Sequence, residues 1–189
     1  MVKNFFLFVF ELIKIVTISL IIIIPIRHFL IQPFYVKGAS MEPNFHDSEY
    51  LIIDELSYEL KTPKRGDIIV FRYPRNPQEF FIKRVIGLPG EKVQIQDGMV
   101  FITNSTNPNG IALDEPYLAT GTKTYGLSDN DVITLGKDEY YVLGDNRNSS
   151  KDSRSFGPVN KSFIIGRVLL RGWPFDKVKL FNNSPAYNF

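Results

Sequence analysis

The sequence contains no cysteine and only two histidines, His28 and His46. The absence of cysteine excludes disulfide bonds, thiolate metal sites and a cysteine nucleophile. The 22 basic and 20 acidic residues nearly balance, so the chain lacks the broad positive charge that nucleic-acid-binding proteins use. No HExxH motif or cluster of Cys and His ligands is present. We therefore expect chemistry based on hydroxyls, amines and carboxylates, with no metal, no cofactor and no nucleic-acid partner.

Charged residues are scarce over residues 5–26, where Glu11 and Lys14 are the only two. A helix of this length rises about 33 Å, which is enough to cross the hydrocarbon core of a bilayer. A cleaved signal peptide would need a small-x-small pattern beside the run, and a soluble core helix is rarely apolar on every face. We predict an uncleaved transmembrane anchor over residues 5–26, in contact with the lipid bilayer, after a short segment of residues 1–4. The flanking charges do not decide its orientation.

Helical periodicity disappears after the anchor, and alternating apolar residues separated by turn residues take its place. This pattern predicts a mainly β domain of coiled antiparallel sheets over residues 27–189. The stretch 104–131 is rich in Asn, Gly, Thr and Pro, and we predict an irregular accessory region there. The predicted strands are 50–56, 67–73, 79–88, 92–103 with an Asp-Gly turn inside it, 139–143 and 162–173.

Ser40 lies a few residues beyond the anchor, and therefore close to the expected membrane surface. Gly38 and Ala39 leave room for another backbone to approach, and Pro43 favours a turn just after the serine. Such a setting suits an exposed nucleophilic hydroxyl, although an ordinary loop has the same pattern. The segment alone does not distinguish these two interpretations.

A serine nucleophile needs a base, and the histidines are poorly placed for that role. His28 belongs to the edge of the anchor, and His46 follows Ser40 by six residues across a proline. A lysine neutralised by burial is the alternative base. In the strand 79–88, Lys83 shares a face with Phe81 and Val85, so apolar neighbours flank its amine. From this strand alone, a lysine that faces solvent is the favoured interpretation.

A third segment, residues 144–157, is dense in hydrogen-bonding groups. Inside a domain such groups must satisfy one another, which indicates a polar network; on the surface the same residues would form a solvated turn. Asp152 and Arg154 are spaced to pair, and the hydroxyl of Ser150 is a candidate for orienting a lysine amine.

Together these segments resemble type I signal peptidases, the bacterial enzymes that remove signal peptides from exported preproteins. The resemblance extends from the anchor to about Phe175, and the single anchor resembles the smaller Gram-positive-type enzymes. It implies a bacterial cell-membrane protein with a cytoplasmic amino terminus and an extracytoplasmic catalytic domain. Five features occur in the family's order: the anchor, Ser-Met-x-Pro at 40–43, Gly-Asp-Ile-Ile-Val at 66–70, Lys-Arg-x-x-Gly-x-Pro-Gly at 83–90, and Gly-Asp-Asn-Arg with Asp-Ser-Arg within 144–154.

The resemblance also implies a role for each motif residue. Ser40 would attack the carbonyl carbon after a small-x-small sequence, Lys83 would act as general base, and Ser150 would orient the Lys83 amine. Two ion pairs, Arg84 with Asp145 and Asp152 with Arg154, would support the site. The substrate would bind as an added extended strand. The side chains expected to shape its pockets are Val36, Met41, Phe81 and Ile82.

Three positions depart from the family pattern. Gly38 stands where some members have a serine that donates to the oxyanion, Asn44 stands where threonine is usual, and Glu91 stands where aspartate is usual. These departures leave open a non-catalytic or specialised relative, acting as an assembly or chaperone factor for a dedicated exported client such as a pilin. A self-cleaving repressor also uses a Ser/Lys pair, but the apolar anchor and the missing DNA-binding domain argue against it.

Overall fold

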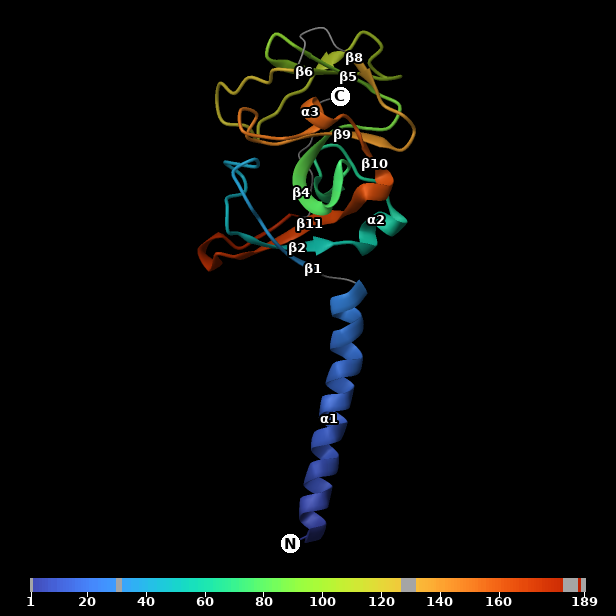
Figure 1. The fold of residues 1–189 in the computed structure, drawn as a ribbon, viewed down its shortest axis with the longest axis vertical. Coiled ribbons are helices and arrows are strands. Elements are labelled where there is room, and N and C mark those ends of the chain that lie inside the picture. Colours follow the sequence, from blue (N-terminus) through green and yellow to red (C-terminus); the bar gives the residue numbers. More distant parts are fainter. Residues whose placement is uncertain (1, 30–31, 127–131, 182–186, 188–189) are drawn as a thin grey trace.

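The computed structural model describes residues 2–29, 32–126, 132–181 and 187. The first element, α1 (Val2–Phe29), projects away from the β domain (Figure 1). Its segment Phe5–Ile23 has a mean hydropathy of 2.6, and none of it is buried against the rest of the protein. The helix contains the predicted range 5–26 and extends three residues beyond it at each end. Its length and exposure are those of a helix that can cross a membrane.

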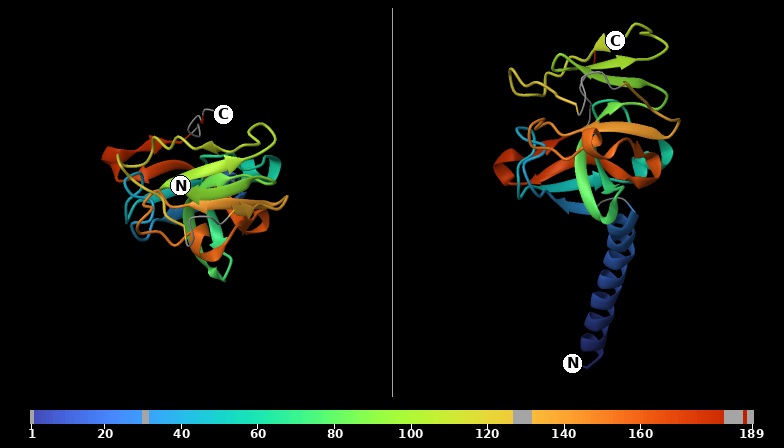
Figure 2. Two further views of the ribbon diagram at one scale, coloured as in Figure 1. Left: turned by 90° about the horizontal axis from the view of Figure 1, so that it is seen from above. Right: turned by 45° about the horizontal axis from the view of Figure 1, so that its top comes forward.

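The larger of two antiparallel sheets lies next to the helix (Figures 1 and 2). Its order among the described strands is β1-β2-β11-β3-β4-β9-β10, with β12 paired to β11. The strands are β1 (Gln32–Tyr35), β2 (Tyr50–Asp54), β3 (Ile68–Tyr73), β4 (Asn76–Gly87), β9 (Glu139–Leu143), β10 (Val159–Asn160), β11 (Ile164–Trp173) and β12 (Lys179–Leu180).

The smaller sheet lies at the end of the domain away from α1 (Figure 2). It has the order β7-β6-β5-β8 and comprises β5 (Lys92–Gln96), β6 (Met99–Thr103), β7 (Ile111–Ala112) and β8 (Val132–Thr134). The hairpin between β5 and β6 turns at Asp97 and Gly98, whose φ values of 53° and 81° match a two-residue turn. The mainly β antiparallel fold and the position of this turn are therefore confirmed.

Short helices and edge strands account for most differences from the predicted elements. The predicted strand 50–56 ends at Asp54, because its carboxylate accepts hydrogen bonds from the backbone and hydroxyl of Ser57 and so starts α2 (Leu56–Leu60). β1 was not predicted, since Pro33 interrupts its pattern; proline is tolerated there because β1 is an edge strand. Three further helical turns are α3 (Ser153–Phe156), η1 (Lys161–Phe163) and η2 (Phe175–Lys177).

Three apolar clusters hold the domain together. One joins the small sheet to β4 and β9 through residues such as Val93, Ile102 and Tyr141. A second packs β3, β4 and β9 against α2 and β10. The third, which contains the fully buried Phe45, fills the space beneath the turn that carries Ser40. Burial of each such side chain contributes about 1.5–3 kcal/mol, so this turn is anchored by the core.

Candidate active site

Ser40, the predicted nucleophile, lies on a compact turn between β1 and β2, which we call the nucleophile turn. The turn is closed by hydrogen bonds from Glu42 N to Ala39 O and from Asn44 N to Met41 O, of 3.2 and 3.0 Å. Met41 and Phe45, on the same turn, are almost completely buried and hold it on the core. Ser40 itself is half-buried, so its hydroxyl stays accessible.

The backbone before Ser40 is held by Asp47. Gly38 adopts a φ of 84°, a left-handed conformation that favours glycine, and its N–H donates to Asp47 Oδ1 over 2.7 Å. The hydrogen bond from Gly38 and a second one from Ser48 lower the pKa of the Asp47 carboxyl. Because the Gly38 N–H is committed to Asp47, it does not replace the serine donor that some family members carry at this position.

Lys83, which forms the predicted Ser/Lys dyad with Ser40, reaches the serine from β4. Its Nζ lies 2.7 Å from Ser40 Oγ and donates over the same distance to the carbonyl oxygen of Ile82. The lysine is 3 % exposed, so the interpretation in which it faces solvent is wrong. Burial lowers the pKa of Lys83 from 10.5 to about 8, while the carboxylates of Asp152 and Asp145 act in the opposite direction. A substantial fraction of Lys83 is therefore a neutral amine near pH 8, the form that can accept a proton.

The loop that follows β9 packs against the turn that carries Ser40. Its Asn146 N–H donates to the carbonyl of Ser40 over 3.0 Å, which ties the loop to the nucleophile turn. Ser150 Oγ is buried and has no hydrogen-bond partner in the described part of the chain. Its predicted contact with Lys83 is thus not formed in this structure, and its role in orienting the lysine stays a prediction.

Gly144 allows this close approach because it has no side chain. A Cβ at position 144 would overlap both Ser150 Oγ and the backbone oxygen of Ser40. We expect Gly144→Ala to lower kcat by about 100-fold, because a displacement of about 1 Å at the dyad is enough for such a loss. Cleavage assays with Gly172→Ala as the control test this, since a Cβ at Gly172 meets nothing within 4 Å. Equal kcat values for the two variants would contradict the close-packing argument.

The two ion pairs that the resemblance implied are both formed at buried positions. Arg84 donates to both carboxylate oxygens of Asp145 over 2.8 and 2.6 Å, and neither side chain is more than 4 % exposed. Asp152 accepts from Arg154 over 2.8 Å and also from the backbone of Gly144. The first pair joins the loop after β9 to β4, and the second lies at the start of α3, within the segment that follows β9. Their supporting function remains a prediction.

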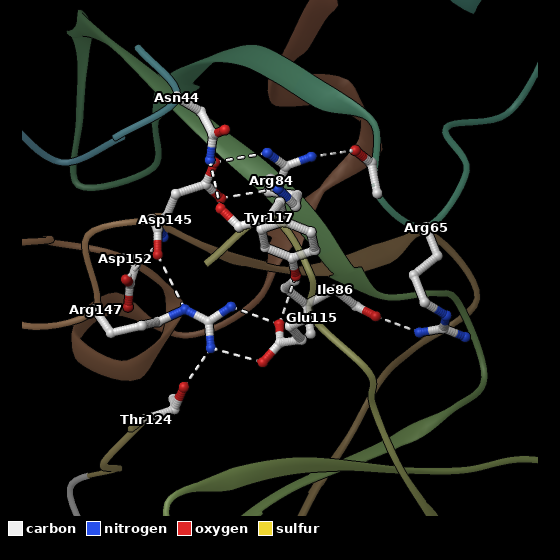
Figure 3. Close-up of polar contacts among 12 residues, drawn as sticks. Asn44, Arg65, Arg84, Ile86, Glu115, Tyr117, Thr124, Asp145, Arg147 and Asp152 are labelled. Atoms are coloured by element: carbon white, nitrogen blue, oxygen red, sulfur yellow. Dashed lines mark hydrogen bonds and ion pairs between the residues drawn. The ribbon is translucent and has the colours of Figure 1, made fainter. Parts of the chain in front are cut away.

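Asn44 connects the nucleophile turn to this network, a role that sequence reasoning did not assign. Its Nδ2 donates to Asp145 Oδ2 and to the carbonyl of Tyr117, each over 2.8 Å (Figure 3). The backbone carbonyl of Asn44 accepts a hydrogen bond from the Arg171 guanidinium of β11. A threonine, with one hydroxyl donor, cannot make both side-chain contacts. In the sequence, the departure from the family pattern at Asn44 was the feature that could have indicated this role.

A second buried network holds the accessory region against the loop after β9. Arg147 forms an ion pair of 2.5 Å with Glu115 and also contacts Thr124 (Figure 3). The predicted accessory stretch 104–131 supplies these partners, although residues 127–131 lie outside the described part of the chain. Glu91, the third departure, pairs with Arg65 over 2.6 Å at a buried position. The sequence reasoning missed these contacts because nothing local links residues so far apart.

The dyad opens into a cleft of about 580 Å³. Val36, Phe81 and Ile82 line it, as predicted for substrate-binding residues. Met41 does not line this cleft: it is 1 % exposed and packs in the cluster beneath the nucleophile turn, so its placement in a substrate pocket is not supported. A second cavity of about 630 Å³ lies near Arg84 and Arg171 and includes neither dyad residue.

Unpaired strand edges face the cleft from two sides. β4 pairs with β3 along residues 80–84, but its pairing with β9 begins only at Arg84. One edge of residues 80–83 is therefore unpaired among the described strands. β1 likewise pairs with β2 on one edge and ends the sheet on the other. Such edges offer backbone donors and acceptors to an extended peptide.

Comparison with known proteins identifies the family of this chain. Residues 9–173 match the family model described as signal peptidase, peptidase S26. A probable signal peptidase I-2 of Synechocystis is 38 % identical over 92 % of this chain and 78 % of its own length. Signal peptidase I of Leptolyngbya laminosa is 39 % identical over 94 % of this chain and 86 % of its own length. Signal peptidase IB of Staphylococcus aureus is 33 % identical over 90 % of this chain and 92 % of its own length.

A crystal structure of a signal peptidase I from Enterococcus faecalis has a TM-score of 0.46 and 38 % identity. The match covers 57 % of this chain and 97 % of that one. The family match and the curated relatives confirm the resemblance found in the sequence. This chain belongs to the signal peptidase family, peptidase S26.

Proposed function

We propose that this protein is a membrane-bound endopeptidase that removes signal peptides from exported preproteins, with Ser40 as nucleophile and Lys83 as general base. The observation that carries the proposal is the 2.7 Å contact between Lys83 Nζ and Ser40 Oγ at a cleft with open strand edges. A non-catalytic assembly factor would have no need of a buried lysine with a lowered pKa at a serine hydroxyl. The same contact therefore speaks against that alternative.

The chemistry follows the usual course of acyl transfer. As Ser40 Oγ bonds to the carbonyl carbon, its proton passes to the neutral amine of Lys83. The resulting ammonium then protonates the leaving amine as the C–N bond breaks, which leaves an acyl-enzyme. Lys83 next takes a proton from water, the hydroxide attacks the ester, and Ser40 leaves with a proton returned by Lys83.

Negative charge that develops on the carbonyl oxygen needs a donor. The Ser40 N–H has no hydrogen-bond partner in the described chain, and we assign it this role. A donor of this kind contributes about 3–4 kcal/mol to transition-state stabilisation. Because the Gly38 N–H is occupied by Asp47, a second donor would have to come from elsewhere or from the protonated Lys83 itself.

We place the substrate as an added strand between β1 and residues 80–83 of β4. Its side chains would alternate, so that the two small residues of a small-x-small site face the apolar wall formed by Val36 and Ile82. With α1 as a single membrane span, residues 1–4 would be cytoplasmic and the domain of residues 27–189 extracytoplasmic. The cleft would then lie near the bilayer, where signal peptides emerge.

Cleavage should depend on the protonation of Lys83. Because the base must be neutral, kcat/KM is expected to rise about tenfold per pH unit below about 8 and to level off above it. A pH series on a purified preprotein, with N-terminal sequencing of the product to locate the cut, measures both activity and site. His46→Ala is expected to leave the rise unchanged. If the rise occurred near pH 6.5 and disappeared in His46→Ala, the assignment of Lys83 would be wrong.

A further inference from the structure

Lys151 stands on the wall of the same cleft as the dyad. Lys151 is exposed and lines the cleft together with Ser40 and Lys83. The Nζ atom lies 4.3 Å from the ring centroid of Tyr73 and 5.9 Å from that of Phe81. The two rings stack on each other at 4.6 Å, so they form one aromatic platform for the ammonium group.

The backbone of Lys151 is fixed more firmly than that of an ordinary surface lysine. The next residue, Asp152, is fully buried, caps α3 and pairs with Arg154. Asp152 is therefore already engaged, and no carboxylate of the described residues lies within 4.0 Å of Lys151. The ammonium is thus held in place by aromatic rings while its charge remains available to a ligand in the cleft.

Charge is unevenly distributed along the cleft. Glu79 lies at the far end of the β4 segment, about 13 Å from Lys83 for four residues of extended strand. Lys151 lies near Phe81, closer to the dyad. Lys37 also lines the cleft, but it follows β1 on the opposite side. Lys151 therefore places a positive charge over the Phe81 part of the cleft, and Glu79 places a negative charge further from Lys83 along β4.

Strand geometry indicates which substrate residue meets Lys151. In a peptide strand added to the edge of β4, side chains alternate between the two faces of the sheet in step with those of β4. A peptide residue beside Ile82 therefore points to the same face as Ile82, and the next peptide residue points to the same face as Phe81. The small residues of the cleavage site occupy the Ile82 face under the proposed function. The residue between them would then point toward Phe81, and so toward Lys151.

We infer that Lys151 is a specificity-determining residue that favours substrates with an acidic side chain at the middle position of the small-x-small site. This inference rests on the proposed signal peptidase function and adds a substrate class to it. An exposed ion pair of this kind is worth about a two- to fivefold gain in kcat/KM.

The test compares two preproteins that differ only in Glu or Gln at the middle position, cleaved by the full-length protein in detergent. The Glu substrate is expected to have a kcat/KM about two to five times that of the Gln substrate, and added salt should reduce the ratio. In Lys151→Gln the ratio should fall to about one, and in Lys151→Glu it should fall below one. Lys37→Gln is the matched control and should keep the wild-type ratio, because its charge lies on the opposite wall.

A wild-type ratio of one, or a ratio that follows Lys37 instead of Lys151, would overturn the inference. Moving the Glu to each neighbouring position in turn checks the geometry, since the effect of Lys151 should be largest at the middle position. Cleavage of the Gln substrate tests the signal peptidase function separately, because that substrate needs no ion pair. A failed Lys151 inference is therefore distinguishable from a failed functional proposal.

Discussion

Replacing either member of the dyad is expected to abolish cleavage of a preprotein by the purified full-length protein. Ser40→Ala removes the atom that forms the acyl-enzyme, and Lys83→Ala removes the base 2.7 Å from it. By comparison with other serine proteases, each loss should lower kcat by about 10⁴-fold or more. Lys83→Arg should be equally inactive, because a guanidinium stays protonated at any pH where the protein is folded.

The double variant makes the test sharper. Groups that act as one unit do not contribute independently, so Ser40→Ala with Lys83→Ala should lose no more activity than either single change. Ser105→Ala and Lys92→Ala, at exposed positions outside the cleft, are matched controls expected to cleave at the wild-type rate. Circular dichroism checks that all variants are folded. Residual activity in Lys83→Ala, or losses that multiply in the double variant, would contradict a Ser/Lys dyad.

The largest effect on stability is expected from Asp145. Its carboxylate is fully buried between Arg84 and Asn44, and Asp145→Ala would leave the Arg84 guanidinium without a counter-ion. Breaking a buried pair in this way costs about 3–5 kcal/mol of the free energy of unfolding. That cost is a large part of the 5–15 kcal/mol by which folded domains are typically stable. Denaturant unfolding of the full-length protein in detergent micelles measures it.

A graded series separates the charge from the hydrogen bonds. Asn44→Ala removes two neutral donors and should cost about 1–3 kcal/mol, since Asp145 keeps its bonds from Arg84. The double change Arg84→Met with Asp145→Leu should recover much of the lost stability, because no buried charge is left unpaired. Asp176→Asn, at an exposed site, should stay within about 0.5 kcal/mol of wild type. A loss for Asp145→Ala as small as that of Asp176→Asn would contradict this account.

Local patterns were sufficient for much of the fold. The apolar run predicted α1, and alternation predicted the strands that became β3, β5, β6 and β9 to within a residue. β1 and α2 were missed for opposite reasons. In β1 a proline hides an edge strand, and in α2 the Asp54 side chain stops a strand that the apolar pattern would continue.

The candidate site was predictable only in part. Ser40 and Lys83 each had an ordinary interpretation, and it was the order of five motifs that selected them. The contacts of Asn44, Arg147 and Glu91 could not be predicted, because each joins residues that lie apart in the chain. Met41 packs in the core and does not line the cleft, because a local sequence motif does not determine which side chains of a turn become buried.

The amino-acid sequence alone specified the groups available to this protein: an apolar helix long enough to span a membrane, a β-rich domain, and a serine and a lysine in place of histidine and cysteine. Composition and the periodicity of apolar residues are properties of the sequence, and they do not depend on how the chain folds. The contact between the serine and the lysine, in contrast, depends on tertiary packing, because the two residues lie 43 positions apart in the chain. Their 2.7 Å contact and the burial that lowers the pKa of Lys83 to about 8 both arise when β4, the nucleophile turn and the loop after β9 pack together.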